Sequence, residues 1–347
     1  MNIPKDTVTA SDFLNTPSGG DQESATFIPL ISVVTTLRRT ARREGRTMNR
    51  HGKLVLERYE LLDQIGSGGQ GELYRGRDTE TGRQVAVKLQ KARLFEPEDS
   101  YRGMGDTFEE EAAMTQQLTG IRGVPRVIAS GPVGFTYERR CIVLEFVEGP
   151  VLYDAMLRGR PLRTPTVASI IGQLCEILHR VHDRQLVHRD IKPENVILDP
   201  SGCVWLIDMG LALHQGEKTD RGDGTPGYVP PDEYDGCPDG VTLLSDIFAL
   251  GCMLLEMTVM QLPYAGMAER PAPDCPVLPP DRMRRVPLQF RSLALSMVDR
   301  VPGNRPQGVR EVFDQLRPLL PTFGSKPPAK PLRPDPTEYY RTRRPTL

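Results

Sequence analysis

The stretch of sequence that decides the fold is His188-Arg189-Asp190-Ile191-Lys192-Pro193-Glu194-Asn195. It places a carboxylate, an ammonium group and an amide at the spacing that phosphoryl transfer to a hydroxyl requires. Asp190 can accept the hydroxyl proton, Lys192 can neutralise the moving γ-phosphate, and Asn195 can hold a magnesium ion. No single residue of the string is diagnostic, but partner motifs precede and follow it in the matching order.

A glycine-rich turn lies upstream, at Gly66-Ser67-Gly68-Gly69-Gln70-Gly71. Its GxGxxG pattern also occurs in dinucleotide-binding folds, where a helix follows the glycines. Here a strand-like segment, Glu72-Leu73-Tyr74-Arg75, follows them, which disfavours that alternative. The context predicts a glycine hairpin whose backbone N–H groups cover nucleotide phosphates, with Leu73 over the adenine.

An alternating strand, Val85-Ala86-Val87-Lys88, follows the glycine turn. Ala86 is small enough for a purine to lie against it, and Lys88 is expected to pair with the α- and β-phosphates and with a helix glutamate. We assign that glutamate to Glu111 because it precedes Ala112 and lies seven residues before apolar Leu118. Its neighbour Glu110 is the alternative.

Taken together, residues 57–320 resemble the protein kinase family, specifically the bacterial Ser/Thr kinases of eukaryotic type. The resemblance implies an α+β, two-lobed fold. Its N-terminal lobe, 57–147, is expected to hold an antiparallel sheet and one helix, and its C-terminal lobe, 148–320, to be mainly helical. The sequence pattern itself predicts strands at 59–66, 72–78, 83–90, 124–131 and 139–146, and helices at 107–119, 165–184, 243–259, 288–299 and 307–320.

The resemblance also implies further nucleotide contacts. It adds Ile65, beside the glycine turn, to the ATP-binding residues. Leu144 is identified as the gatekeeper, and the backbone of Glu145 and Val147 as the partner of adenine. Ile197 is expected to lie under the base.

Two later motifs are similar to those of the family but depart from its pattern. In Leu206-Ile207-Asp208-Met209-Gly210, Met209 replaces Phe, and Asp208 is implied to chelate the magnesium ion. Since Met is apolar and flexible, it can fill the Phe position, so we expect altered switching and not lost activity. Residues 224–232 resemble the substrate-docking loop and its closing motif, with Pro230 in place of Ala and Asp232 in place of Glu.

Residues outside these motifs are implied to support them. Asp232 is expected to pair with Arg305, and Asp246 to hold the backbone of residues 188–189. Lys192 and the docking-loop threonine, Thr225, favour Ser/Thr acceptors. These roles follow from the resemblance alone.

The resemblance also implies a regulatory loop. Arg189 can bind a phosphate on that loop through charge-assisted hydrogen bonds. Thr219 is the candidate autophosphorylation site, and the alternative is constitutive negative charge from Glu217, Asp220 and Asp223.

The predicted function is ATP- and Mg²⁺-dependent transfer of phosphate to protein Ser/Thr residues, with Mn²⁺ as an alternative metal. Two other hypotheses remain. One is an inactive scaffold, suggested by Met209 and the altered 230–232 triplet. The other is a small-molecule kinase, which the peptide-docking loop disfavours.

Bulk composition bounds these predictions. The chain has 347 residues and a formal net charge of −1, which gives no reason to expect nucleic acid as a partner. The longest apolar run near the N-terminus, 27–34, is far below the roughly 20 residues of a membrane span. The six cysteines are scattered without zinc-ligand spacing. We therefore expect no membrane span and a cytoplasmic protein.

Both ends of the chain differ from the middle. Residues 1–56 are polar, then basic, without periodicity, and we expect them to be disordered. A patch for nucleic acid or acidic lipid is the alternative for the basic run, and Met48 is an alternative start. The tail, 321–347, is rich in Pro and Arg and is also expected to be disordered.

Overall fold

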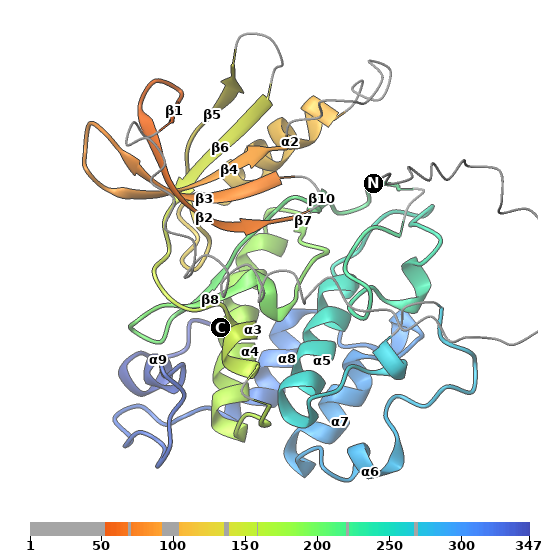
Figure 1. Cartoon of the computed structure of the whole chain (residues 1–347). Coiled ribbons are helices and arrows are strands. Elements are labelled where there is room, and N and C mark those ends of the chain that lie inside the picture. The colour runs from red at the N-terminus through yellow and green to blue at the C-terminus, as the bar shows by residue number, and fades with distance from the viewer. Residues whose placement is uncertain are drawn as a thin grey trace, which may run out of the picture. The chain divides into compact units, whose positions relative to one another are not determined.

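A six-stranded antiparallel sheet forms the N-terminal lobe, with strand order β1-β2-β3-β4-β6-β5 (Figure 1). The computed structural model describes residues 53–68, 71–91, 104–134, 139–157, 159–219, 222–266 and 270–347. The strands are β1 (Leu54–Val55), β2 (Tyr59–Ser67), β3 (Gly71–Asp78), β4 (Gln84–Gln90), β5 (Val127–Val133) and β6 (Arg139–Glu145).

The sheet begins earlier than the sequence predicted. Strand β1 pairs with the start of β2, and Val55 is buried beside Tyr59 in the lobe's core. The prediction of disorder up to residue 56 is therefore wrong for residues 53–56, because Val55 supplies apolar surface that the sheet buries. The rest of that prediction, including the basic run and Met48, lies outside the described residues.

The two faces of the sheet differ in burial. In β4 the side chains of Val85, Val87 and Leu89 are buried, while Ala86 and Lys88 point to the opposite, partly exposed face. Helix α2 (Met104–Gln117) packs beside β5 and β6, with Phe108 of the helix buried against the sheet. The face that carries Lys88 is thereby brought next to the helix that carries the candidate glutamate.

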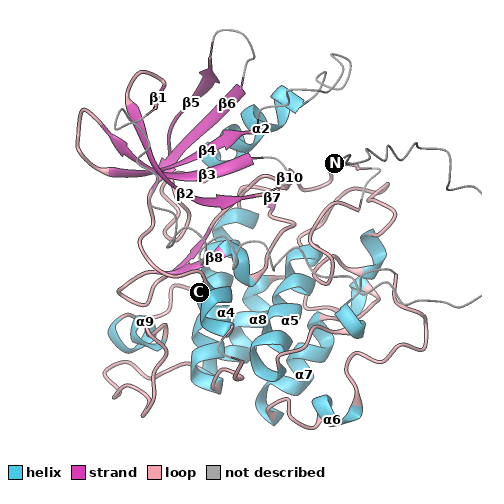
Figure 2. Ribbon diagram, viewed as in Figure 1, coloured by secondary structure: helices cyan, strands magenta, loops and turns pink. Residues whose placement is uncertain are grey.

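The C-terminal lobe is built around two long buried helices, α4 (Thr164–His182) and α5 (Leu244–Val259) (Figure 2). Most residues of both helices are buried, which fits helices at the centre of a lobe. The lobe also contains α3 (Leu152–Met156), α6 (Pro280–Met283), α7 (Leu288–Met297) and α8 (Val309–Leu316).

Two small pairs of strands position the motifs. Strand β8 (Val196–Leu198) follows the catalytic string and pairs with β9 (Val204–Leu206), which ends just before Asp208. Strand β7 (Leu186–Val187) precedes the string and pairs with β10 (Leu213–His214). Both motifs are therefore held at strand ends beside one another.

The tail does not match its prediction. Residues 321–347 contain helix α9 (Thr337–Thr342), which packs on α4 (Figure 1). Tyr339 and Tyr340 are each only 1% exposed and belong to the core of the lobe. The predicted disorder is therefore wrong, because two aromatic rings bury enough apolar surface to order a segment that composition alone marks as irregular.

The predicted α+β, two-lobed fold is confirmed. The predicted strands and helices appear in their expected order, with ends shifted by a few residues. Within the described residues, no helix combines the length and the hydrophobicity that crossing a lipid bilayer demands.

Candidate active site

Asp246 holds the turn on which the catalytic string begins. It lies fully buried at the start of α5, where it accepts hydrogen bonds from the peptide nitrogens of His188 at 3.0 Å and Arg189 at 2.9 Å. Arg189 has φ of +65°, a left-handed conformation that costs energy for any residue other than glycine. The two hydrogen bonds from Asp246 therefore stabilise a strained turn that aims the following residue, Asp190.

His182 is a second partner of Asp246 that sequence reasoning missed. Its Nε2 lies 2.8 Å from Asp246 Oδ2. Burial would raise the pKa of Asp246, but the hydrogen bond to His182 and those from the backbone outweigh it and lower this pKa below its ordinary value. No local spacing marks His182, which lies at the end of α4, so no sequence signal could have found it.

Asp190 lies at the centre of a network of four side chains. Its Oδ1 accepts a hydrogen bond from Thr225 Oγ1 at 2.6 Å, and its Oδ2 accepts one from Lys192 Nζ at 2.7 Å. Lys192 Nζ also lies 2.5 Å from Thr225 Oγ1. Asn195 Nδ2 donates to the Asp190 carbonyl at 2.8 Å and to its Oδ2 at 2.9 Å. A carboxylate, an ammonium group and an amide are thus held together beside the docking-loop threonine.

Lys88 connects the two lobes. Its Nζ lies 2.7 Å from both carboxylate oxygens of Glu111 on α2 and 2.8 Å from Asp208 Oδ1 in the C-terminal lobe. Burial alone would lower the pKa of Lys88, but the charges of Asp208 and Glu111 raise it to about 12. Lys88 is therefore a fixed positive charge between two carboxylates.

Helix α2 presents Glu111 to Lys88 and turns its neighbour away. The side chain of Glu111 is only 3% exposed, whereas Glu110 is exposed. Successive helical residues point about 100° apart, so only one member of a run of glutamates can face the sheet. The contact falls on Glu111, the residue that precedes Ala112.

Asp208 is held by Lys88 and by its own turn. Its φ is +67°, and Gly210 N donates to Asp208 Oδ1 at 3.2 Å. Partial burial would raise the pKa of Asp208, but Lys88 outweighs this and lowers it. The neighbouring Met209 is only 3% exposed and lies in the core of the C-terminal lobe, where Met114 of α2 also packs.

Strand register brings the expected nucleotide contacts to one face of the sheet. Leu73 of β3 lies opposite Lys88, and Ala86 lies opposite Leu144 of β6. Directly paired residues point to the same side of a sheet, so these four side chains share the partly exposed face.

The glycine turn carries a close backbone approach. At Gly71, a Cβ atom would lie 3.0 Å from the Leu89 carbonyl oxygen, so a side chain there would crowd the next strand. Gly68 N donates to the Gly71 carbonyl at 2.8 Å, which closes the turn. Ile65, Gly66 and Ser67 lie at the end of β2. Gly69 and Gln70 lie outside the described residues.

The segment that follows β6 joins the lobes. Glu145 N donates to the Arg126 carbonyl at 3.0 Å at the end of β6. Val147 lies between β6 and α3 and is partly buried. Ile197 of β8 is also partly buried and pairs with Val151, which precedes α3. The expected base-binding residues of the C-terminal lobe are therefore adjacent to the connecting segment.

Asp232 and Arg305 form a direct ion pair. The Arg305 side chain is fully buried, donates to the Asp299 carbonyl at 2.8 Å and lies 5.0 Å from the centre of the Phe248 ring. Asp232 is partly exposed, so its removal would leave the buried guanidinium of Arg305 without its charged partner. The shorter aspartate therefore still reaches its arginine.

Arg189 and Thr219 both lie beside Cys237. The backbone of Thr219 pairs with that of Cys237, with Cys237 N donating to the Thr219 carbonyl at 2.7 Å. Burial raises the pKa of the Cys237 thiol to about 11, and the nearby positive charge of Arg189 opposes this rise. Within the described residues, Arg189 Nε and Nη2 are buried and have no hydrogen-bond partner. Asp220 lies outside those residues.

Two further contacts fix the docking loop and were not predicted. Tyr228 donates its hydroxyl to Glu256 on α5, and Ser245 donates to Glu233. Burial raises the pKa of both Tyr228 and Glu256. A glutamate within the apolar run of α5 is the one sequence signal by which Glu256 could have been found.

Comparison with known proteins agrees with this geometry. The protein kinase domain model matches residues 59–311. Serine/threonine-protein kinase pkn2 of Myxococcus xanthus is 31% identical over 282 residues, which cover 76% of this chain and 32% of that protein. A probable serine/threonine-protein kinase PknB of Lactococcus lactis is 31% identical over 220 residues, 62% of this chain and 34% of that protein.

A more distant relative gives the same result. Serine/threonine-protein kinase PknB of Mycobacterium leprae is 27% identical over 287 residues, 79% of this chain and 44% of that protein. The chain thus spans less than half the length of these curated relatives. The predicted family is confirmed: the chain belongs to the protein kinase domain family, with bacterial serine/threonine-protein kinases among its relatives.

Proposed function

We propose that this chain is an ATP-dependent protein serine/threonine kinase. The observation that carries the proposal is the network at Asp190, whose carboxylate is bound by Lys192, Asn195 and Thr225. Family membership and the names of the relatives support the same activity.

Each side chain of the network has a role in the proposed reaction. Asp190 orients the acceptor hydroxyl and takes its proton as the oxygen attacks the γ-phosphorus of ATP, whose bond to the departing ADP breaks. Lys192 neutralises negative charge on the transferring phosphoryl group, and Lys88, held by Glu111, binds the α- and β-phosphates. Positioning and electrostatic stabilisation supply the rate, because phosphoryl transfer needs little covalent help from the protein.

Asn195 and Asp208 fit a hard divalent cation. A carboxylate and an amide oxygen are ligands that Mg²⁺ prefers, and Mn²⁺ accepts the same donors. The amide nitrogen of Asn195 is engaged with Asp190, so its oxygen is the atom that can bind the metal. When bound, the cation neutralises charge on the phosphates. Mg²⁺ is the metal we propose, with Mn²⁺ as the substitute.

The proposed acceptors are serine and threonine residues of proteins. Thr225 bonds to both Asp190 and Lys192, which couples the docking loop to the reacting groups. A peptide on that loop is thereby placed next to the proton acceptor. No feature of the site favours a nucleic acid as the acceptor.

Transfer of labelled phosphate tests the proposal. The wild-type protein is incubated with γ-labelled ATP, Mg²⁺ and a generic protein substrate, or with a metabolite extract in its place. We expect label on protein, released as phosphoserine and phosphothreonine after acid hydrolysis. Label only on a metabolite indicates a small-molecule kinase, and ATP binding without transfer indicates a scaffold; either result rejects the proposal.

We also propose that Thr219 is autophosphorylated and that Arg189 binds the phosphate. Support comes from their common neighbour Cys237 and from the two buried guanidinium nitrogens without a partner among the described residues. Thr219→Ala should reduce activity and remove a loop phosphate detected by mass spectrometry. Full activity in the variant, or a wild-type loop without phosphate, contradicts this and favours constitutive charge from Glu217 and its acidic neighbours.

A further inference from the structure

Helix α4 carries a buried carboxylate away from the candidate active site. Glu176 is only 2% exposed, and its neighbours Cys175 and Ile177 are equally buried. An ionised carboxylate in such a place is stable only when hydrogen bonds and charges compensate for lost water. The segments that supply those hydrogen bonds and charges must therefore be in place for this part of the lobe to be stable.

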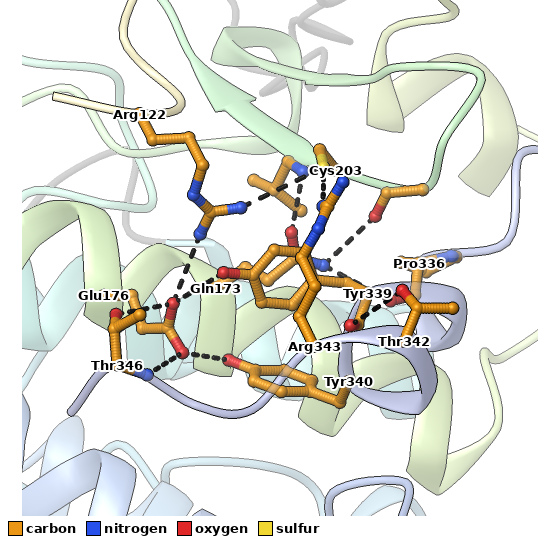
Figure 3. Close-up of polar contacts among 12 residues, drawn as sticks. Arg122, Gln173, Glu176, Cys203, Pro336, Tyr339, Tyr340, Thr342, Arg343 and Thr346 are labelled. Carbon is orange, nitrogen blue, oxygen red and sulfur yellow. Dashed lines mark hydrogen bonds and ion pairs between the residues drawn. The ribbon is translucent and has the colours of Figure 1, made fainter. Parts of the chain in front are cut away.

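The C-terminal segment supplies most of these partners (Figure 3). Tyr339 donates its hydroxyl to Glu176 Oε2 at 2.9 Å, and Tyr340 donates to Oε1 at 3.2 Å. Thr346 adds its peptide nitrogen at 3.2 Å and its hydroxyl at 3.0 Å. Three residues of the tail thus converge on one carboxylate of α4.

The remainder of the lobe is shaped to receive this segment. A Cβ atom at Gly172 of α4 would lie 2.9 Å from the Tyr340 hydroxyl, and one at Gly202 would lie 2.1 Å from the Asp335 carbonyl oxygen. Gln173 donates from Nε2 to the Gly202 and Pro336 carbonyls at 3.1 and 3.2 Å. The β8–β9 turn and α4 therefore hold the tail by close backbone contact as well as by polar bonds.

The remaining partner of Glu176 belongs to a different part of the chain. Arg122 lies in the loop between α2 and β5 and donates from Nη2 to Glu176 Oε2 at 3.2 Å. Its guanidinium lies 4.2 Å from the centre of the Tyr339 ring (Figure 3). Arg122 thus contacts both the buried carboxylate and the tail.

The loop that carries Arg122 is continuous with the helix that carries Glu111. Leu118, which directly follows α2, is fully buried in the core of the C-terminal lobe, as is nearly all of Ile121. Gly123 accepts a hydrogen bond at 2.7 Å from Leu206, two residues before Asp208. A shift of Arg122 therefore reaches α2 through packed side chains and not through a flexible linker.

We infer that residues 321–347, which we call the strap, set the position of α2 by completing the bonds of Glu176 and holding Arg122. With the strap docked, Glu111 lies against Lys88. With the strap displaced, the buried carboxylate keeps Arg122 as its one partner among the described residues, and the loop and α2 move to satisfy it. Glu176 and Arg122 are positioning residues in this account, which rests on the proposed kinase activity for its effect on rate.

Variants of the 347-residue chain with small changes test the strap. Tyr340→Phe and Thr346→Val are combined, which removes two hydroxyls that donate to Glu176 and keeps the side-chain volumes. The control is Thr342→Val, since within the described part of the chain the Thr342 hydroxyl bonds to carbonyls of its own helix alone. Two quantities are measured well below the unfolding temperature: kcat/KM for ATP, and hydrogen exchange of the backbone amides of 108–117.

We expect the combined variant to lose about five- to tenfold in kcat/KM, a typical coupling between distant sites, and to exchange faster in α2. The control should match the wild type in both. Unchanged exchange in α2, with or without a lower unfolding temperature, overturns the inference because the tail is then only a stabilising element. Thr346→Val alone changes an exposed residue next to the C-terminus, so it keeps the test open if the double variant does not fold.

A double-mutant cycle with Arg122→Gln identifies the route. The cycle combines Arg122→Gln with the Tyr340→Phe and Thr346→Val changes. If the strap acts through Arg122, the losses of kcat/KM for ATP from the two sets of changes are not additive. Additive losses overturn the proposed route. A wild-type protein that transfers no phosphate rejects the proposed function, and hydrogen exchange in α2 still decides whether the strap positions the helix.

Discussion

Thr225 of the docking loop donates its hydroxyl to Asp190 Oδ1 at 2.6 Å, while Lys192 Nζ contacts both residues. The loop expected to hold a peptide is thereby bound to the group expected to take the acceptor's proton. Substrate docking and chemistry share one hydrogen-bond network, so a change in the loop should alter the rate of transfer.

Replacing Thr225 should slow the reaction without weakening ATP binding. Thr225→Val keeps the volume and removes the hydroxyl, so Asp190 and Lys192 lose a common partner. We expect kcat to fall by about ten- to a hundredfold, since small misplacements of catalytic groups have effects of this size. Thr225→Ser, which keeps the hydroxyl, should retain most of the activity. Equal kcat values for the Val and Ser variants would show that the hydroxyl has no such role.

Glu111 and Glu110 offer a matched comparison on one helix. Glu111→Gln removes the charge that holds Lys88, so Lys88 should turn wholly to Asp208. We expect kcat/KM for ATP to fall by about a hundredfold through misplacement of Lys88. Glu110→Gln, an exposed neighbour, should have little effect. Steady-state kinetics of both variants check this, and a larger loss in Glu110→Gln would reassign the ion pair.

The pH dependence of stability should reveal Asp246. Its pKa lies below the ordinary value of 3.8 because His182 and the backbone bind the charged form. A lowered pKa stabilises the fold above the unfolded-state value, and this stability is lost as pH falls through the folded-state value. Asp246→Asn should therefore be less stable than the wild type above about pH 4, with a gap that narrows on acidification. Urea unfolding between about pH 3 and pH 6 measures the difference in unfolding free energy between the wild type and Asp246→Asn. A difference that grows as the pH falls would contradict the assignment.

Two glycines distinguish backbone strain from tail docking. Gly82 and Gly202 have φ of +71° and +76°, but only Gly202 faces the tail backbone, whereas Gly82 has open space. Gly82→Ala should cost about 1–2 kcal/mol of unfolding free energy from its left-handed conformation alone. Gly202→Ala should cost about 1–3 kcal/mol more, because the added methyl displaces residue 335 and the segment after it. Equal losses in thermal unfolding would mean that the tail is not docked there.

The active-site motifs could be predicted because their catalytic residues lie close together in the sequence. Asp190, Lys192 and Asn195 fall within six residues, and Lys88 lies in a strand that the alternation of apolar and polar residues reveals. Glu111 could be chosen over Glu110 because a helix turns neighbouring side chains in different directions. Side chains that lie close together in the sequence can thus be placed from the periodicity of a helix or strand alone.

The tail and the support of Asp246 could not be predicted in this way. Tyr339 and Tyr340 bond to Glu176, and Tyr340 packs closely on Gly172, so their partners lie more than 150 positions earlier in the sequence. The Pro- and Arg-rich composition of the segment is, in addition, typical of a solvated tail. His182 meets Asp246 only after α4 and α5 have packed. A glutamate in the apolar run of α4, at Glu176, was the one signal of a buried polar network.

Phosphate transfer by Asp190→Asn tests the central claim most directly. The amide keeps the size of the side chain but cannot accept a proton from the acceptor hydroxyl. At saturating ATP and Mg²⁺, we predict that the variant binds ATP as the wild type does and transfers phosphate about a hundred- to ten-thousandfold more slowly. A variant that transfers at the wild-type rate would contradict the assignment of Asp190 and the mechanism built on it.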